Sequence, residues 1–197
     1  MEISETHSIL LLGIFIGVSS ILLMYWITYI INPYLRNKET ETPDNIPEPV
    51  KIEDDTIPQE AITLIKKFEG FRAVQYLDAG GKPTIGYGET ATNLKSITES
   101  QATNLLEARL KELKEQIHKV VLVSLNENQL SAILSFCYNL GFGSFERSTL
   151  LKMINKKASN AALEVFFTQW NQVGGIRNEA IYNRRLKEYQ LFVKESD

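Results

Sequence analysis

A run of 25 residues without a charged side chain, residues 8–32, divides this chain and limits what each part can fold into. At about 1.5 Å per residue, a helix of this length crosses a hydrocarbon core of about 30 Å with some tilt. Tyr25, Trp26 and Tyr29 lie near its C-terminal end, as expected of an interfacial aromatic belt. The run therefore predicts one transmembrane helix or signal-anchor, after a short flank at residues 1–7.

The segment that follows, residues 33–56, has the composition of a tether. It contains four prolines, seven acidic and three basic side chains, and almost no apolar face to bury. Such a chain spans about 25 to 30 Å on average and about 75 Å when extended. Residues 57–197 remain as a folded domain with 18 basic and 15 acidic side chains. This small positive balance suits an anionic polymer, but ordinary surface variation explains it equally well.

Amphipathic patterns predict that the 57–197 domain is mostly helical. Thr56 to Gln59 has the spacing of a capping box before a first helix that closes at Gly70. A second capping signal at 98–101 precedes a long helix with one apolar stripe. The stripe is Leu106, Leu110, Leu113, Ile117 and Val121, and later helices are expected at about 127–140, 149–156, 159–170 and 178–193.

Residues 68–88, FEGFRAVQYLDAGGKPTIGYG, place two carboxylic acids and one hydroxyl at three structural joints. Glu69 ends the first helix, Asp78 precedes a double-glycine turn, and Thr84 begins the returning strand of a hairpin. One helix-to-hairpin unit can therefore direct all three side chains to one place. Hydrolysis of a glycosidic bond needs two carboxylates in unequal environments. One is protonated to assist the leaving oxygen, and the other is ionised to activate water or stabilise a cation.

The same stretch resembles the phage-type lysozyme (endolysin) family, glycoside hydrolase family 24. The family pattern is Glu-Gly, then Tyr-x-Asp nine residues after the Glu, then Thr-Ile-Gly-Tyr-Gly. This chain has both family intervals, nine residues from Glu69 to Asp78 and six from Asp78 to Thr84. The likeness covers about residues 57–192 and continues through Asn128-Gln129, Ser135-Phe136, Asn139-Leu140-Gly141, Ser148-Thr149-Leu150-Leu151, Trp170, Gly174-Gly175, Arg184-Arg185 and Glu188.

The resemblance implies an α+β, mostly helical fold with two lobes, a small β-hairpin lobe and a helical lobe joined by a long helix, here preceded by one transmembrane helix. It implies a muramidase that cuts the β-1,4 bond between N-acetylmuramic acid and N-acetylglucosamine in peptidoglycan and so lyses bacteria. Glu69 would be the general acid, while Asp78 and Thr84 would hold the water or stabilise the developing cation. Peptidoglycan is the expected partner of a monomeric domain that needs no cofactor and binds no nucleic acid.

Each catalytic candidate also has a structural explanation. Glu69 could be a surface acid at a helix end, Asp78 a turn residue, and Thr84 a strand former. Singly, these explanations are favoured, whereas the three residues together at the family's spacing favour catalysis. Two other functions stay open. A catalytically silent peptidoglycan-binding protein is supported by Glu89, which stands where the family usually has His, and a transglycosylase is opposed by Asp78 and Thr84.

Four further features have competing interpretations. Arg184 and Arg185 could form a solvated pair on the last helix, or one could pack beneath the site and orient the glutamate as its ion-pair partner. Trp170 is expected in the core rather than as a sugar platform. Cys137 is the only cysteine, so a disulfide within one chain is impossible, and it should be a small buried hydrophobe. His118 lacks the neighbours that a metal site needs, and no metal is expected.

The predicted location follows from the substrate. Arg36 and Lys38 lie after the uncharged run, so the positive-inside rule favours a cytoplasmic C-terminus, but Glu39 and Glu41 dilute this bias. Because peptidoglycan lies outside the inner membrane, we predict a single-pass inner-membrane protein with its catalytic domain in the periplasm. Some members of the resembled family carry a signal-anchor that later leaves the bilayer, whereas this Ile- and Leu-rich run predicts retention.

Overall fold

The computed structural model of this chain describes residues 56–78, 80–90 and 92–195. The predicted transmembrane run, 8–32, lies outside these ranges, and so does the predicted tether up to residue 55. Within the described ranges, no helix combines the length and the apolar character that crossing a membrane requires.

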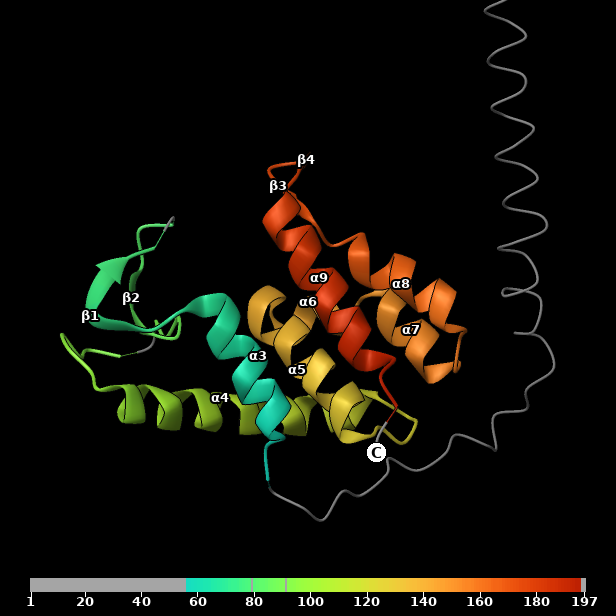
Figure 1. Cartoon of the computed structure of the whole chain (residues 1–197), viewed down its shortest axis with the longest axis horizontal. Coiled ribbons are helices and arrows are strands. Elements are labelled where there is room, and N and C mark those ends of the chain that lie inside the picture. Colours follow the sequence, from blue (N-terminus) through green and yellow to red (C-terminus); the bar gives the residue numbers. More distant parts are fainter. Residues whose placement is uncertain (1–55, 79, 91, 196–197) are drawn as a thin grey trace, which may run out of the picture. The chain divides into compact units, whose positions relative to one another are not determined.

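The described chain is mostly helical and contains a small antiparallel sheet, as the sequence predicts (Figure 1). A second, very short hairpin precedes the last helix. In chain order the elements are α3 (Gln59–Glu69), β1 (Arg72–Leu77), β2 (Pro83–Gly86), α4 (Glu99–Val120), α5 (Glu127–Leu140), α6 (Phe142–Glu146), α7 (Thr149–Asn155), α8 (Asn160–Thr168), β3 (Gln172–Val173), β4 (Ile176–Arg177) and α9 (Glu179–Phe192).

The β1–β2 hairpin follows α3 directly. α3 ends at Glu69 because Gly70 adopts a φ of 67°, a left-handed conformation that glycine reaches without steric cost. The two strands pair antiparallel, and their register places Tyr76 opposite Thr84. Strand β2 also contacts α4, and Figure 1 shows the hairpin at one end of α4, on the left of the view.

Helices α4 and α5 form much of the hydrophobic core. α4 begins with the predicted capping box, in which Thr98 Oγ1 accepts from Gln101 N at 3.2 Å and Gln101 Oε1 accepts from Thr98 N at 2.9 Å. α5 is buried continuously over residues 130–137, because it packs against α3, α4, α6 and α9. The predicted α4 stripe is buried at Leu106, Leu110, Leu113, Ile117 and Val121.

Three details differ from the sequence predictions. The capping box expected at Thr56–Gln59 is wrong, since the N-cap is Pro58, which has φ −56° and ψ 131° and makes no side-chain cap. A residue before proline avoids helical angles, so Ile57 cannot open the helix, and it is instead buried together with Pro58. Helix α6 and the β3–β4 hairpin were not predicted. The other expected helices, 127–140, 149–156, 159–170 and 178–193, correspond within two residues at each end to α5, α7, α8 and α9.

Candidate active site

Glu69 is the last residue of α3, at the joint between that helix and the β1–β2 hairpin. Its side chain is 23% exposed, so the carboxyl is largely enclosed and still reachable by a ligand. The structure therefore places Glu69 at the helix end that the sequence predicted.

Arg184 holds the Glu69 carboxyl. Its Nη1 donates to Glu69 Oε1 at 2.6 Å, and its guanidinium lies over the ring of Phe68, 4.8 Å from the ring centre. The Arg184 side chain is only 8% exposed and comes from the second turn of α9. Of the two interpretations of the arginine pair, the ion-pair partner of Glu69 is confirmed for Arg184, and the solvated pair is wrong.

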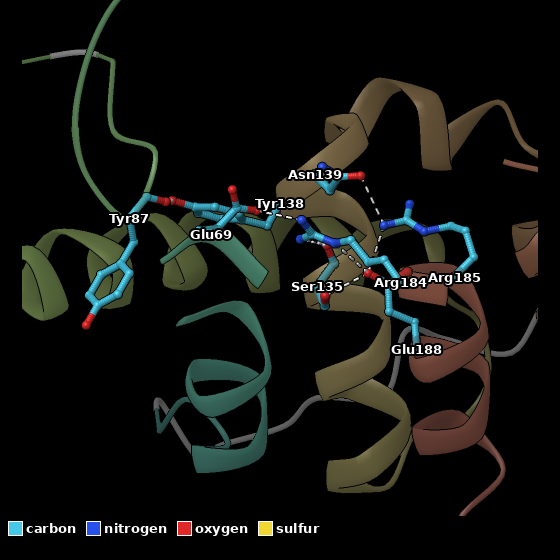
Figure 2. Close-up of polar contacts among 8 residues, drawn as sticks. All are labelled: Glu69, Tyr87, Ser135, Tyr138, Asn139, Arg184, Arg185 and Glu188. Carbon is cyan, nitrogen blue, oxygen red and sulfur yellow. Dashed lines mark hydrogen bonds and ion pairs between the residues drawn. The ribbon is translucent and has the colours of Figure 1, made fainter. Parts of the chain in front are cut away.

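Beneath Arg184 lies a buried polar network that joins α5 and α9 (Figure 2). Glu188 Oε1 accepts hydrogen bonds from Arg184 Nε at 3.2 Å and from Arg185 Nη2 at 2.9 Å. Ser135 Oγ donates to the same oxygen at 2.7 Å, and the Ser135 carbonyl accepts from Arg184 Nη2 at 3.3 Å. Arg185 Nη2 also donates to Asn139 Oδ1 at 3.1 Å. The guanidinium of Arg184 is thus fixed on several sides before it reaches Glu69.

Glu188 lies between the guanidiniums of Arg184 and Arg185, and Glu69 brings a second carboxyl group to Arg184. Burial raises the pKa of Glu188, while the guanidiniums of Arg185 and Arg184 and the Ser135 hydroxyl oppose that rise. Burial likewise lowers the pKa of Arg185 to about 10, which leaves it protonated at neutral pH. An unpaired charge at this depth would cost several kcal/mol, so the members of the network depend on one another.

On its other side, Glu69 faces the end of the hairpin. Tyr138 of α5 donates from its hydroxyl to the Tyr87 carbonyl at 2.7 Å, which ties the hairpin end to the helical region (Figure 2). A Cβ placed on Gly88, whose φ is 101°, would lie 3.7 Å from both Glu69 Oε2 and the Tyr138 hydroxyl. Arg184 therefore takes one oxygen of Glu69, and the other oxygen faces Gly88.

Asp78 and Thr84 are both held by the backbone of Lys82. Asp78 Oδ1 accepts from the backbone N–H of Gly80 and of Lys82, each at 2.8 Å. Thr84 is 3% exposed, and its hydroxyl donates to the Lys82 carbonyl at 3.0 Å. Neither residue forms a hydrogen bond or ion pair with Glu69 in the part of the chain that the structure describes. Their catalytic role therefore stays a prediction.

Glu89 places another carboxylate at the hairpin end. Two backbone hydrogen bonds with Ile85, both 2.9 Å, fix its position. Burial raises the pKa of this half-buried carboxyl, Arg109 lowers it and Glu112 raises it further. Arg109 and Glu112 pair on α4 at 2.8 Å. Helix α4, rather than the buried network, thus sets the charge environment of Glu89.

The remaining candidates behave as structural residues. Trp170 packs edge-on against Phe136, with ring centres 5.8 Å apart, which confirms its predicted place at the core. Cys137 is buried, as predicted, and burial raises the pKa of its thiol. Across residues 56–78, 80–90 and 92–195, no group of three or more His, Cys, Asp or Glu side chains could hold a metal ion.

Sequence reasoning assigned no role to Ser135, Tyr138, Asn139 and Glu188. The sequence did contain a signal for Glu188, because Arg184 and Glu188 are four residues apart and therefore share one face of a helix. Burial of that face could not be read from α9 alone, since the covering residues come from α5. Tyr138 sits one turn from Ser135, within an apolar helix that was interpreted only as core.

A mostly helical domain in which a helix-terminal glutamate opens directly into a small antiparallel hairpin defines the lysozyme-like class of fold. The solved structures agree. The muramidase domain of SpmX from Asticaccaulis excentricus matches with a TM-score of 0.65 and 28% identity, covering 71% of this chain and 99% of that domain. A P22 lysozyme mutant matches with a TM-score of 0.62 and 33% identity, covering 71% and 99%.

The Phage lysozyme family model matches residues 66–188. The endolysin of Salmonella phage P22 is 33% identical over 144 residues, which are 70% of this chain and 97% of that protein. The SAR-endolysin of Bacteriophage PS34 is 34% identical over 126 residues, 62% and 75% of the two chains. The endolysin of Bacillus phage PZA is 36% identical over 142 residues, 69% of this chain, and the chain spans about half of that relative, 54% of its length.

This chain belongs to the phage lysozyme family.

Proposed function

We propose that this protein is a muramidase that hydrolyses the β-1,4 bond between N-acetylmuramic acid and N-acetylglucosamine in peptidoglycan, and so degrades the bacterial cell wall. The observation that carries the proposal is the 2.6 Å ion pair between Glu69 and the buried Arg184, which holds a partly exposed carboxyl at the hairpin joint. Membership of the phage lysozyme family, whose relatives are named endolysins, supports the same chemistry.

In the proposed mechanism Glu69 is the general acid. Its Oε2, which faces Gly88 rather than Arg184, delivers the proton to the leaving glycosidic oxygen. Asp78 and Thr84 hold the attacking water and stabilise the positive charge that develops on the sugar ring. Water attacks the anomeric carbon from the face opposite the breaking C–O bond and gives up a proton to the Asp78 carboxylate, so the configuration inverts and the first product is the α-anomer.

The proposed site of action is the periplasm. Residues 8–32 would anchor the protein in the inner membrane, and residues 33–56 would let the domain search the polymer near the bilayer. SAR-endolysins among the relatives, from Bacteriophage PS34 and Enterobacteria phage P21, support a membrane-associated enzyme that acts outside the cytoplasm.

Product analysis tests the proposal. Purified peptidoglycan is incubated with the full chain in mild detergent, and the fragments are followed by mass spectrometry and NMR. We expect new N-acetylmuramic acid reducing ends that appear first as the α-anomer. An initial β-anomer would indicate a retaining enzyme, and anhydro-muramic ends would indicate a transglycosylase. Binding to peptidoglycan without new ends would indicate the catalytically silent alternative.

A further inference from the structure

Glu188 is a carboxylate with no access to solvent or substrate. Its side chain is 0% exposed, and burial of such a group costs several kcal/mol unless partners compensate for it. One of its oxygens, Oε1, receives hydrogen bonds from three side chains, those of Ser135, Arg184 and Arg185. Its other oxygen, Oε2, is buried without a hydrogen-bond partner among the described residues. The contacts of Glu188 therefore converge on one atom that faces the arginine pair.

The guanidinium of Arg184 connects this atom to the proposed catalytic acid. Each of its three nitrogens donates to a different group: Nε to Glu188 Oε1, Nη2 to the Ser135 carbonyl and Nη1 to Glu69 Oε1. A guanidinium is planar and its donors form a rigid fork. Glu188 and Ser135 fix two of its corners, and the ring of Phe68, 4.8 Å from the guanidinium, limits its rotation about the line through them, so the third corner is fixed as well. The position of Nη1, and with it the orientation of Glu69, depends on Glu188.

We propose that Glu188 is a positioning residue for Glu69, acting through Arg184. It sets the plane of the guanidinium so that Nη1 holds Oε1 of Glu69 and leaves Oε2 toward Gly88, the side from which the proton is delivered. This inference rests on the proposed muramidase function.

The competing explanation is that Glu188 only neutralises Arg185. Arg185 is 0% exposed, lies 4.8 Å from the ring centre of Phe136 and bonds to Asn139, and it makes no hydrogen bond or ion pair with Glu69 in the described part of the chain. A purely neutralising Glu188 would therefore affect stability but not the rate of the folded enzyme. The two explanations therefore predict different values of kcat per folded molecule for a Glu188 variant, and the experiment measures that value.

The test compares Glu188→Gln, Glu188→Asp and the control Glu179→Gln in the full chain. Glu179 forms an ion pair with Arg177 at 3.3 Å, in which both side chains are more than half exposed, so its loss should leave the rate unchanged. The kinetic probe is solubilised, fluorescently labelled peptidoglycan, and folding is followed by thermal unfolding. A neutral amide oxygen holds the guanidiniums of Arg184 and Arg185 more weakly than the carboxylate oxygen does, so Arg184 should shift in Glu188→Gln. We expect kcat per folded molecule to fall about 10- to 100-fold with KM within about twofold, the loss produced by misplacement of a catalytic group by about 1 Å.

Two further arms make the test specific. Glu188→Asp keeps the charge, so it should recover part of the lost kcat. The double variant Glu188→Gln with Arg184→Lys should be no slower than Arg184→Lys alone, because two residues that act through one contact are not additive. The inference would be overturned if the loss of kcat in the double variant equalled the product of the losses in the two single variants. A wild-type kcat in folded Glu188→Gln would overturn it as well.

A folding failure of Glu188→Gln does not end the test. Ser135→Ala removes one donor to Glu188 Oε1 and leaves the charged groups of Glu188, Arg184 and Arg185 in place. If Glu188 positions Glu69, this folded variant should lose kcat several-fold, and an unchanged kcat would overturn the inference. Failure of the proposed function gives a different result, because the wild-type chain itself would then release no new reducing ends.

Discussion

The two regions that supply the proposed catalytic residues are built in different ways. In the β1–β2 hairpin, Asp78 and Thr84 are satisfied by the backbone of Lys82, no more than four residues away along the chain. In the helical region, Glu69 is held by Arg184, 115 residues further on, and that arginine is fixed in turn by two other helical residues. Strand β1 is exposed except for one half-buried residue, and β2 is buried at Thr84, Ile85 and Gly86. The network behind Glu69 has almost no access to solvent at any of its charged groups other than Glu69 itself.

This difference decides what a mutation can reveal. Contacts within four residues form as soon as the turn forms, so a change in the hairpin can remove chemistry and leave the helical core intact. The network behind Glu69 requires α3, α5 and α9 to be packed together. Changes there affect folding and catalysis at once, and each needs a measurement of stability beside the measurement of rate.

Glu69→Gln should give the largest effect. The amide keeps an oxygen that can accept from Arg184 Nη1, so the geometry of the pair can persist, but it cannot deliver a proton. We expect clearing of a peptidoglycan suspension to fall about 10²- to 10⁴-fold in a chain that still folds, with an unfolding temperature lowered by the loss of one charged partner of Arg184. Retention of more than about a tenth of the activity would show that the helical region does not supply the acid.

Asp78→Asn should give the next largest effect and tests the hairpin. Asparagine keeps the Oδ1 acceptor for the Gly80 and Lys82 N–H groups, so the turn should survive while the negative charge is lost. We expect activity to fall about tenfold or more, since a water-positioning carboxylate is part of the acid–base chemistry. Asp78→Ala is the matched comparison, because it removes the charge together with the side-chain contacts to Gly80 and Lys82 and keeps the backbone hydrogen bonds of Asp78. Wild-type activity in Asp78→Asn would make Asp78 a turn residue and leave the hairpin without a catalytic carboxylate.

The same contrast explains how much of the molecule could be predicted from sequence. The hairpin could be predicted because its determinants are local: Gly70 stops the helix, a double glycine makes the turn, and Asp78 supplies the acceptor within it. The capping box at Thr98 and the stripe along α4 are equally local. Where a local rule failed, at Thr56, a competing local rule was stronger, namely the restriction that Pro58 places on Ile57.

The support behind Glu69 could not be predicted in the same way. The sequence showed two arginines, and whether they were solvated depended on which helix covered them. Ser135 and Glu188 are 53 residues apart, and the packing of α5 against α9 brings them within 2.7 Å. Only the packed structure showed that one carboxylate oxygen collects three donors, and that Arg184 rather than Arg185 reaches the proposed acid.

Tyr138→Phe tests the tie between the two regions. Burial, Glu89 and Glu69 raise the pKa of this phenol well above its ordinary value, so it remains a hydrogen-bond donor throughout the working pH range. Removal of its 2.7 Å bond to the Tyr87 carbonyl should cost about 0.5 to 1.5 kcal/mol of unfolding free energy and lower activity a few-fold. Tyr189→Phe is the control, a core-packed ring whose hydroxyl has no hydrogen bond among the described residues. Equal effects of the two variants would show that the hydrogen bond from Tyr138 to the Tyr87 carbonyl makes no specific contribution to stability or activity.

His118→Gln should give the smallest effect, and one visible only in its pH dependence. His118 lies on α4, the helix that contacts both regions, and its Nε2 is buried without a hydrogen-bond partner in the described structure. Burial, followed by Lys114, lowers its pKa below the ordinary value of 6.5, so the folded state resists the proton that the unfolded state accepts. Stability from this source is complete above pH 6.5 and is lost as the pH falls below it, because the unfolded chain then binds more protons. Denaturant titrations of the full chain between pH 7 and pH 5 should therefore show a shallower loss of unfolding free energy for His118→Gln than for wild type, with unchanged activity at neutral pH. His7→Gln removes the chain's other histidine and should reproduce the wild-type slope. A slope for His118→Gln as steep as that of wild type would show that protonation of His118 does not contribute to the pH dependence of the unfolding free energy.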